Sequence, residues 1–168
     1  NLGFDPTVFT SRSLIYFFRN KIKLTPVTKI LVNSNTSKNH ISSKFYSLNP
    51  KVVGETVNSK IKRLIQILKK DRSDYIFISA PENVAWLLNI RGRDNPFSPI
   101  PNCIIIINIK GEVSFFSDIK KSSNILKKKV LLRISFYKEN QIENFLAKLK
   151  AKKIIIDKNS CPVSLENF

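Results

Sequence analysis

The sequence predicts an α/β domain with a mixed, mostly parallel sheet that is flanked by helices and includes one β-hairpin. Short apolar runs rich in β-branched and aromatic residues alternate with segments whose apolar residues recur at helical spacing. Two of the runs are separated only by Lys110 and Gly111, which is typical of a hairpin turn. From Lys51 onward the order is therefore helix, strand, helix, hairpin, helix, strand, helix, strand, as in α/β folds.

Composition narrows the classes of protein further. The 168 residues suffice for one domain with a core, or for one domain and a piece of another. The net charge of +17 comes mostly from scattered lysines, so we favour a solvated basic surface and expect no nucleic-acid partner. No apolar run reaches the roughly 18 residues that span a bilayer, so we expect no membrane partner. Two cysteines without a motif indicate a reducing, cytoplasmic compartment.

The first third of the chain predicts a small unit followed by a linker. Residues 1–9 resemble the end of a strand and a turn, and Thr10 or Ser11 can cap a helix that reaches about Asn20. Lys21 to Val32 follows as an extended segment, which Pro26 restricts to a sheet edge or a turn.

Asn33 to Asn49 is polar and irregular, so we interpret it as an exposed linker and as the best domain boundary. We therefore expect two parts, residues 1–48 and residues 49–168. The linker holds the only histidine, His40, which we expect to be exposed to solvent and not a metal ligand.

Gly54 to Lys70 carries the clearest helical pattern. Its apolar residues form one stripe, Thr56 is a suitable N-cap, and the charged side chains, Lys60 among them, should point mostly away from that stripe. Tyr75 to Ser79 then predicts a buried strand. A helix from Pro81 to Leu88 should follow, and its core-facing residues are expected to be Val84, Trp86 or Leu87, and Leu88.

The loop from Asn89 to Pro101 is the richest in polar groups between apolar blocks, and its three prolines stiffen it. Arg91 and Arg93 could offer forked donors to a carboxylate of a ligand or partner. Alternatively, Asp94 could pair with one of these arginines and merely order the loop. The residues alone leave both interpretations open.

The hairpin and the second half of the domain follow this loop. The hairpin strands are expected at Asn102–Ile109 and Glu112–Ser117, the first of them buried on both faces. The remaining predictions are a helix at Ser122–Lys129, a strand at Val130–Tyr137, a helix at Glu139–Ala151, a strand at Lys153–Asp157 and no clear element from Asn159 to Phe168.

The segment around the loop follows a distinctive pattern, D/E-x-[IV]-A-W-L-[LF]-N-[LI]-R-G-x-D, directly after a predicted strand. The pattern is filled by Glu82, Val84, Ala85, Trp86, Leu87, Leu88, Asn89, Ile90, Arg91, Gly92 and Asp94. In this the segment resembles the second creatinase-like domain of the three-domain Xaa-Pro aminopeptidases, a family that carries this signature. The flanks agree, because GFDP near the start is similar to the end of the family's first domain. The resemblance thus implies a creatinase/prolidase N-terminal-like domain at 49–168 and a remnant of a first such domain, with its linker, at 1–48.

The resemblance also implies an activity and the place of its metal site. Family members cleave the bond before a proline at the second position of a peptide, and they use two metal ions, usually manganese. The ligands, two Asp, one His and two Glu, belong to a C-terminal "pita-bread" domain. With a single histidine in its linker, this chain lacks that ligand set. We therefore expect no metal, no catalytic residue and no hydrolysis in this chain alone.

The leading hypothesis is a non-catalytic N-terminal portion of such an enzyme, which covers the active site and aids assembly as a homodimer. Its loop from Asn89 to Asp94 should face the catalytic cleft. The candidate substrate-binding residues are Arg91, Asp94 and Arg93, with Arg91 the first choice, and Trp86 is expected in the core. The alternatives are a stand-alone basic module that binds RNA or an acidic partner, and an inactive product of a split gene.

Overall fold

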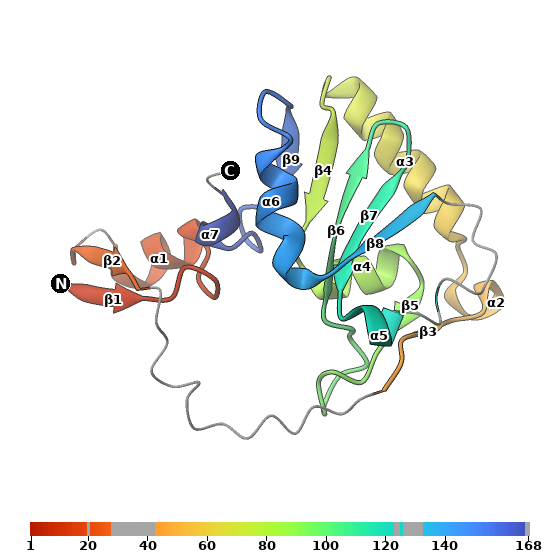
Figure 1. Cartoon of the computed structure of the whole chain (residues 1–168), viewed down its shortest axis with the longest axis horizontal. Helices are drawn as coiled ribbons and strands as arrows, with labels where there is room; N and C mark the ends of the chain where they lie inside the picture. The colour runs from red at the N-terminus through yellow and green to blue at the C-terminus, as the bar shows by residue number, and fades with distance from the viewer. Residues whose placement is uncertain (20, 28–42, 123–124, 126–132, 167–168) are drawn as a thin grey trace.

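A five-stranded mixed sheet lies at the centre of the computed structural model, which describes residues 1–19, 21–27, 43–122, 125 and 133–166 (Figure 1). Its strand order is β8-β7-β6-β4-β9. The bounds are Tyr75–Ile78 (β4), Cys103–Asn108 (β6), Val113–Ser117 (β7), Ile134–Tyr137 (β8) and Ile154–Ile156 (β9). The predicted α/β class, the mixed sheet and the hairpin, β6-β7, are confirmed.

The expectation of a mostly parallel sheet is confirmed, because β4, β7, β8 and β9 run in one direction and only β6 runs opposite to them. β4 pairs with β9, and β7 with β8, in parallel, whereas β6 pairs antiparallel with both of its neighbours, β4 and β7. Strand β6 of the hairpin is therefore the central strand of the sheet, and both antiparallel pairings involve it.

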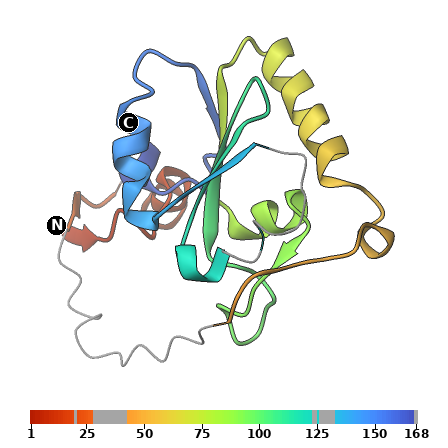
Figure 2. The same ribbon diagram turned by 45° about the vertical axis from the view of Figure 1, so that its right-hand side comes forward.

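Helices α3 (Val57–Lys70) and α4 (Pro81–Leu87) cover one face of the sheet (Figures 1 and 2). The predicted α3 stripe is confirmed, since Ile61 is buried in the core against strands β6 and β7 and the other stripe residues are buried or packed beside it. Thr56 caps α3 by accepting a hydrogen bond from the Ser59 backbone N–H at 3.3 Å. In α4, Leu87 is buried and Trp86 is 54% exposed, so the expectation that Trp86 is a core residue was wrong.

The opposite face packs against the 3₁₀ turn η2 (Glu139–Gln141) and helices α6 (Ile142–Ala147) and α7 (Val163–Glu166). Phe77, Ile106 and Phe116 from the sheet meet Ile142 and Leu146 of α6 there. The predicted helix from Glu139 is therefore confirmed over a shorter length, and the tail expected to lack an element contains α7.

The first 27 residues form a small unit, which we name the N-terminal unit. It consists of parallel strands β1 (Leu2–Phe4) and β2 (Leu24–Pro26) joined by helix α1 (Ser11–Phe18). The Thr10 side chain caps α1, as predicted, by accepting from Ser13 N at 3.0 Å. Backbone hydrogen bonds of 2.9 Å, from Val163 N to Phe9 O and from Ser164 N to Pro6 O, attach this unit to α7.

Residues 43–53 precede α3 and belong to the main body. Strand β3 (Tyr46–Ser47) pairs antiparallel with β5 (Ile90–Arg91), helix α2 (Pro50–Val53) follows, and Phe45 is fully buried. The expectation that this segment is an exposed linker was therefore wrong for Phe45 to Ser47, because the Phe45 ring packs in the core beneath the loop and Tyr46–Ser47 pair with β5. Residues 28–42, with His40, lie outside the described residues.

Helix α5 (Ile119–Ser122) follows β7 and begins before the predicted Ser122–Lys129 helix, most of which lies outside the described residues. Of the predicted strand at Val130–Tyr137, the described part, β8, is confirmed. Within the described ranges, no helix is long and apolar enough to cross a membrane.

Candidate functional site

The polar loop folds back on itself directly before β6. The Gly92 N–H donates to the Pro99 carbonyl at 3.1 Å and so closes the loop at its base. A Cβ on Gly92 would lie 2.7 Å from the Pro101 Cα and 3.1 Å from the Phe45 ring, so only glycine fits this close approach. The buried Phe45 thus supports the base of the loop from beneath.

Asp94 holds the loop to the neighbouring helix. Its carboxylate forms an ion pair with Lys121 of α5, and the Asp94 and Lys121 side chains are only 1% and 12% exposed. The second carboxylate oxygen accepts a hydrogen bond from the Asn102 N–H at 2.7 Å, at the entry to β6. Asp94 therefore does form an internal ion pair, as one of the two interpretations of the sequence had it. Its cation, however, is Lys121 and neither Arg91 nor Arg93.

Arg91 holds the other side of the loop. Its Nη1 donates to the Ala85 carbonyl at 3.2 Å and to its own neighbour's carbonyl, Ile90 O, at 2.8 Å. A cation that bonds a carbonyl in the last turn of α4 also meets the negative end of the helix. Arg91, which the sequence analysis gave as the first choice for a substrate contact, therefore bonds acceptors within this chain and fixes the loop to α4.

Arg93 differs from both of these residues. It is exposed, and it forms no hydrogen bond or ion pair with any residue of the described part of the chain. Of the three predicted site residues, Arg93 is therefore the one whose charged group has no partner among the described residues and is available to an outside group.

Beyond Arg93 the loop ends in a tight turn that presents an aromatic ring. The Asn95 side chain accepts from Phe97 N at 3.0 Å, and Asn95 O accepts from Ser98 N at 3.4 Å. Phe97 is 96% exposed. We did not single out Phe97 from the sequence, although an aromatic residue between two prolines in a polar loop is a usable signal.

A buried polar cluster lies behind the loop. Lys60 is 2% exposed, and its Nζ donates to Trp86 O at 2.6 Å and to Asn89 Oδ1 at 2.7 Å. The same Nζ lies 4.1 Å from the centre of the Trp86 ring, a cation–π contact. Burial lowers the pKa of Lys60, and the charge of Glu55 partly opposes this. The expectation that Lys60 points away from the packed side of α3 was therefore wrong.

Asn89 completes this cluster. Its φ of 52° is left-handed, a conformation that asparagine tolerates, and its Nδ2 donates to the Glu55 carbonyl at 2.9 Å. Lys60 and Asn89 thus bind the start of α3 to the end of α4, so the loop emerges from a rigid base.

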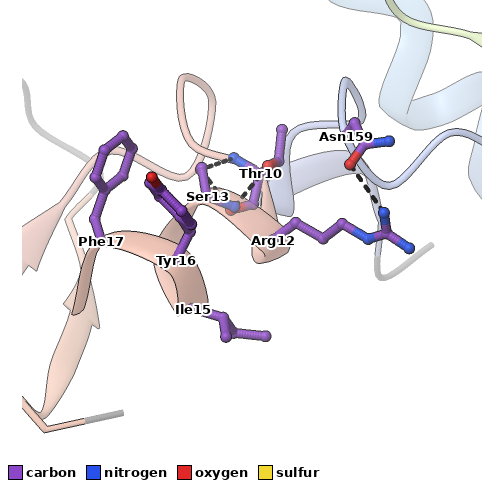
Figure 3. Close-up of a pocket in the computed structure, with 7 residues that line it drawn as sticks. All are labelled: Thr10, Arg12, Ser13, Ile15, Tyr16, Phe17 and Asn159. Atoms are coloured by element: carbon purple, nitrogen blue, oxygen red, sulfur yellow. Dashed lines mark hydrogen bonds between the residues drawn. The ribbon is translucent and has the colours of Figure 1, made fainter. Parts of the chain in front are cut away.

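Among the hollows on the described surface, two that lie away from the loop are lined by exposed aromatic side chains. One, of about 290 Å³, lies between α3, α4, β4 and β9, where Trp86 and Leu64 line it and Asp157 stands at its rim; we name it the Trp86 hollow. The other, of about 530 Å³, lies along α1, where Ile15, Tyr16 and Phe17 are exposed (Figure 3). Figure 3 also shows Arg12, which donates to Asn159 Oδ1 at 3.0 Å beside this second hollow.

No group of three or more His, Cys, Asp or Glu side chains in the described ranges is placed to hold a metal ion. The two cysteines are free and buried, and burial raises the pKa of both thiols, that of Cys161 to about 11. Neither thiol has the electropositive, accessible surroundings of a reactive cysteine.

Comparison with solved structures defines the class of fold. The chain superposes on an X-prolyl aminopeptidase from Caenorhabditis elegans with a TM-score of 0.81, over 98% of this chain and 29% of that one, at 20% identity. That protein is described as a cytosolic enzyme with a di-nuclear active site. The fold is therefore the α/β fold of the part of that aminopeptidase on which this chain superposes.

Sequence comparison gives the family. The model of the creatinase/prolidase N-terminal domain matches residues 14–168, so this chain belongs to that family, as its signature had indicated. It is 28% identical over 120 residues to Xaa-Pro aminopeptidase 1 of Dictyostelium discoideum, a match that covers 70% of this chain and 19% of that protein. A probable Xaa-Pro aminopeptidase P of Fusarium vanettenii is 32% identical over 108 residues, covering 60% and 17% respectively. The chain spans less than a fifth of the length of these two relatives.

Proposed function

We propose that this chain is the non-catalytic N-terminal portion of an Xaa-Pro aminopeptidase, in which it covers the active site and aids assembly. The observation that carries the proposal is the family match over residues 14–168 to a domain that is N-terminal by description. Relatives bearing the aminopeptidase name, and a solved aminopeptidase with the same fold, support it. The substrate would be a peptide with proline at its second position, and the enzyme would act in the cytoplasm.

The metal chemistry is proposed to belong to a separate catalytic domain. There, two manganese ions held by two Asp, one His and two Glu would activate a water molecule and polarise the scissile carbonyl. The described residues offer no comparable ligand group, so no step of the reaction is assigned to this chain.

The loop from Asn89 to Pro101 is the surface that this chain would contribute. Asp94, tied to Lys121, and Arg91, tied to α4, set its shape. Arg93 would contact a carboxylate of the peptide substrate or of a partner chain in a homodimer. The proposal thus keeps all three predicted residues but gives the outside contact to Arg93.

We also propose that the chain divides as predicted, into the end of a first creatinase-like domain (residues 1–48) and the second (residues 49–168), except that residues 43–48, which include the core residue Phe45, are assigned to the second. The N-terminal unit supports this division, because a two-stranded parallel sheet is normally part of a larger sheet with both faces covered. Its α1 exposes Ile15, Tyr16 and Phe17 on a face that the rest of such a domain would cover (Figure 3).

Two measurements test the proposal. Reading the coding sequence past the Phe168 codon should reveal the five metal ligands in order, and a continuation without them would overturn the proposal. The purified 168-residue chain, supplied with Mn²⁺, should release no N-terminal residue from a peptide with proline at position two. Hydrolysis that a chelator abolishes would overturn the non-catalytic assignment.

A further inference from the structure

We infer that a hollow at the carboxyl ends of β7 and β8 binds a small molecule that carries both an ammonium and a carboxylate group, that is, a free amino acid or a short peptide. This inference goes beyond the proposed aminopeptidase role and does not depend on a catalytic domain. It rests on the topology of the sheet, on a hollow at the corresponding place and on the charges that line this hollow.

Strands β7 and β8 form a topological switch point. They are parallel neighbours, so their carboxyl ends lie side by side. After β7 the chain turns to the face covered by α3 and α4, where Ile125 packs in the same core as Phe115. After β8 it turns to the opposite face, where Ile142 of α6 packs in the same core as Phe116. In open α/β sheets, ligands bind in the crevice outside the carboxyl ends of two such strands.

A hollow of about 800 Å³ lies at this place, and we name it the switch-point hollow. Ser117 and Asp118 line it from the end of β7, and Lys138, Glu139 and Asn140 line it from the end of β8. Helix α5 and the beginning of α6 lie close to each other at this end of the sheet (Figures 1 and 2). Pockets for small ligands have volumes of about 300–1,000 Å³, so the hollow is large enough for an amino acid or a short peptide.

The charges that line the switch-point hollow are balanced, although the chain as a whole is strongly basic. Of 12 acidic and 29 basic residues in the sequence, three of each line the hollow: Asp94, Asp118 and Glu139, and Lys120, Lys121 and Lys138. Asp94 and Lys121 pair with each other.

Three of the remaining charges are exposed at the hollow. Asp118, Lys138 and Glu139 form no ion pair with any residue of the described ranges. A ligand of a single sign would meet groups of both signs here. A zwitterion, in contrast, can place its ammonium group at the carboxylates and its carboxylate at Lys138, where charge-assisted hydrogen bonds are strong.

A phosphorylated ligand fits the switch-point hollow less well. Nucleotide phosphates are held at such places by the backbone of a glycine-rich turn. None of the four glycines, all of which lie in the described ranges, lines this hollow. The carboxylates of Asp118 and Glu139 would also repel a phosphate. Asn102 and Asn140 instead offer side-chain amides, which can bond the N–H and C=O groups of a peptide.

The hollow shares a wall with the stem of the polar loop. Asp94 and Asn102 both line it, and the Asn102 N–H donates to the Asp94 carboxylate at 2.7 Å. A bound ligand would therefore lie beside this hydrogen bond. The amide signal of Asn102 is thus a suitable reporter of binding.

Binding is measured on the purified 168-residue chain by ¹H–¹⁵N correlation spectra. The titrations are made at 0.15 M salt, where a Debye length of about 8 Å screens nonspecific attraction. Trialanine and free alanine are the two probes, which distinguishes a peptide from an amino acid as the ligand. We expect the amide signals of Asn102, Asp118 and Glu139 to shift together, with a Kd of about 1 mM or below for at least one probe.

Blocked probes test whether both charges are recognised. N-acetylation removes the ammonium charge of the probe, and amidation removes its carboxylate. Each blocked form should bind about tenfold or more weakly than the parent probe, because one of the two charged contacts is lost.

Variants assign the two contacts to residues. The double variant Asp118→Asn/Glu139→Gln should weaken the parent probe about tenfold and should not weaken its N-acetylated form. Asparagine at 118 keeps a side-chain oxygen for the hydrogen bond that Lys120 N donates at 2.9 Å, so the local fold is preserved. Lys138→Gln should weaken the parent probe and leave the affinity for its amidated form unchanged.

Glu143→Gln and Lys148→Gln are the matched controls, because both residues are exposed and neither lines the hollow. Both should bind the probes as the wild type does. Unchanged spectra up to about 20 mM of either probe would overturn the inference, and so would blocked probes that bind as well as the parent. Neither result bears on the peptidase proposal, which the coding sequence and the hydrolysis assay decide.

Discussion

Asp94 and Lys121 form an almost fully buried ion pair that joins the polar loop to α5. Removing one partner of a buried pair leaves the other charge without compensation, so Asp94→Asn should lower the free energy of unfolding by about 3 kcal/mol in urea denaturation. Adding Lys121→Met should recover part of this loss. The exposed pair of Glu112 and Arg133 is the control, and Glu112→Gln should leave the urea midpoint nearly unchanged. Equal effects at both pairs would contradict this prediction.

Gly92 is required because the loop base passes so close to Pro101. Gly92→Ala should lower the free energy of unfolding by about 2 kcal/mol, because the new Cβ meets backbone and not a flexible side chain. Gly54→Ala is a useful comparison, since Gly54 has a φ of 75° but open space around it. That variant should lose only the roughly 1 kcal/mol of the left-handed backbone. If Gly92→Ala is as stable as the wild type, the close approach is not maintained in solution.

The buried Lys60 predicts a pH dependence of stability. Burial places its folded pKa below the unfolded value of 10.5, so between these two values the unfolded chain holds more protons. The free energy of unfolding should therefore rise with pH through this window. Lys60→Met removes this contribution, so the stability of the wild type relative to Lys60→Met should increase from pH 7 to pH 10 in urea titrations. Parallel pH profiles would rule this out.

The thiols of Cys103 and Cys161 should be unreactive in the folded chain. Both cysteines are buried, and the pKa of Cys161 is raised from 9.0 to about 11. At pH 8 a disulfide reagent such as DTNB should react with neither thiol in buffer and with both in urea. The raised pKa stabilises the fold below pH 9, and this contribution is lost as the pH rises through about 11. A fast reaction in buffer would show that one thiol is accessible.

The positive charge is expected to have no nucleic-acid function. Affinity for nonspecific RNA should be weak at physiological salt, and log K should fall only gently with log salt concentration. A steep slope would instead favour the alternative of a stand-alone basic binding module. This measurement uses the purified 168-residue chain.

The sequence predicted the elements whose patterns are long or strongly apolar. Helix α3 and the β6-β7 hairpin followed from periodicity, because many residues repeat the same signal. The two-residue strands β3 and β5 were missed, since their pairing joins segments more than 40 residues apart and leaves no local pattern. The place of the hairpin in the middle of the sheet is equally a property of tertiary pairing.

Side-chain roles were harder to predict than elements. The sequence identified Arg91, Arg93 and Asp94 as the polar core of the loop, but not which of them has internal partners. Those partners, Ala85 O for Arg91 and Lys121 for Asp94, are set by the folded path of the chain. Lys60 was misplaced for a similar reason, because its buried acceptors come from the end of another helix.

The attachment of the N-terminal unit to α7 has a consequence for the order of folding. Residues 6–9 of that unit find their backbone partners at 163 and 164, at the opposite end of this chain. During synthesis the central sheet can assemble first, because its strands leave the ribosome before residues 163 and 164. The N-terminal unit can form its backbone hydrogen bonds only after these two residues have emerged. Closing a loop this long is entropically slow, so docking of this unit should follow the assembly of the central sheet.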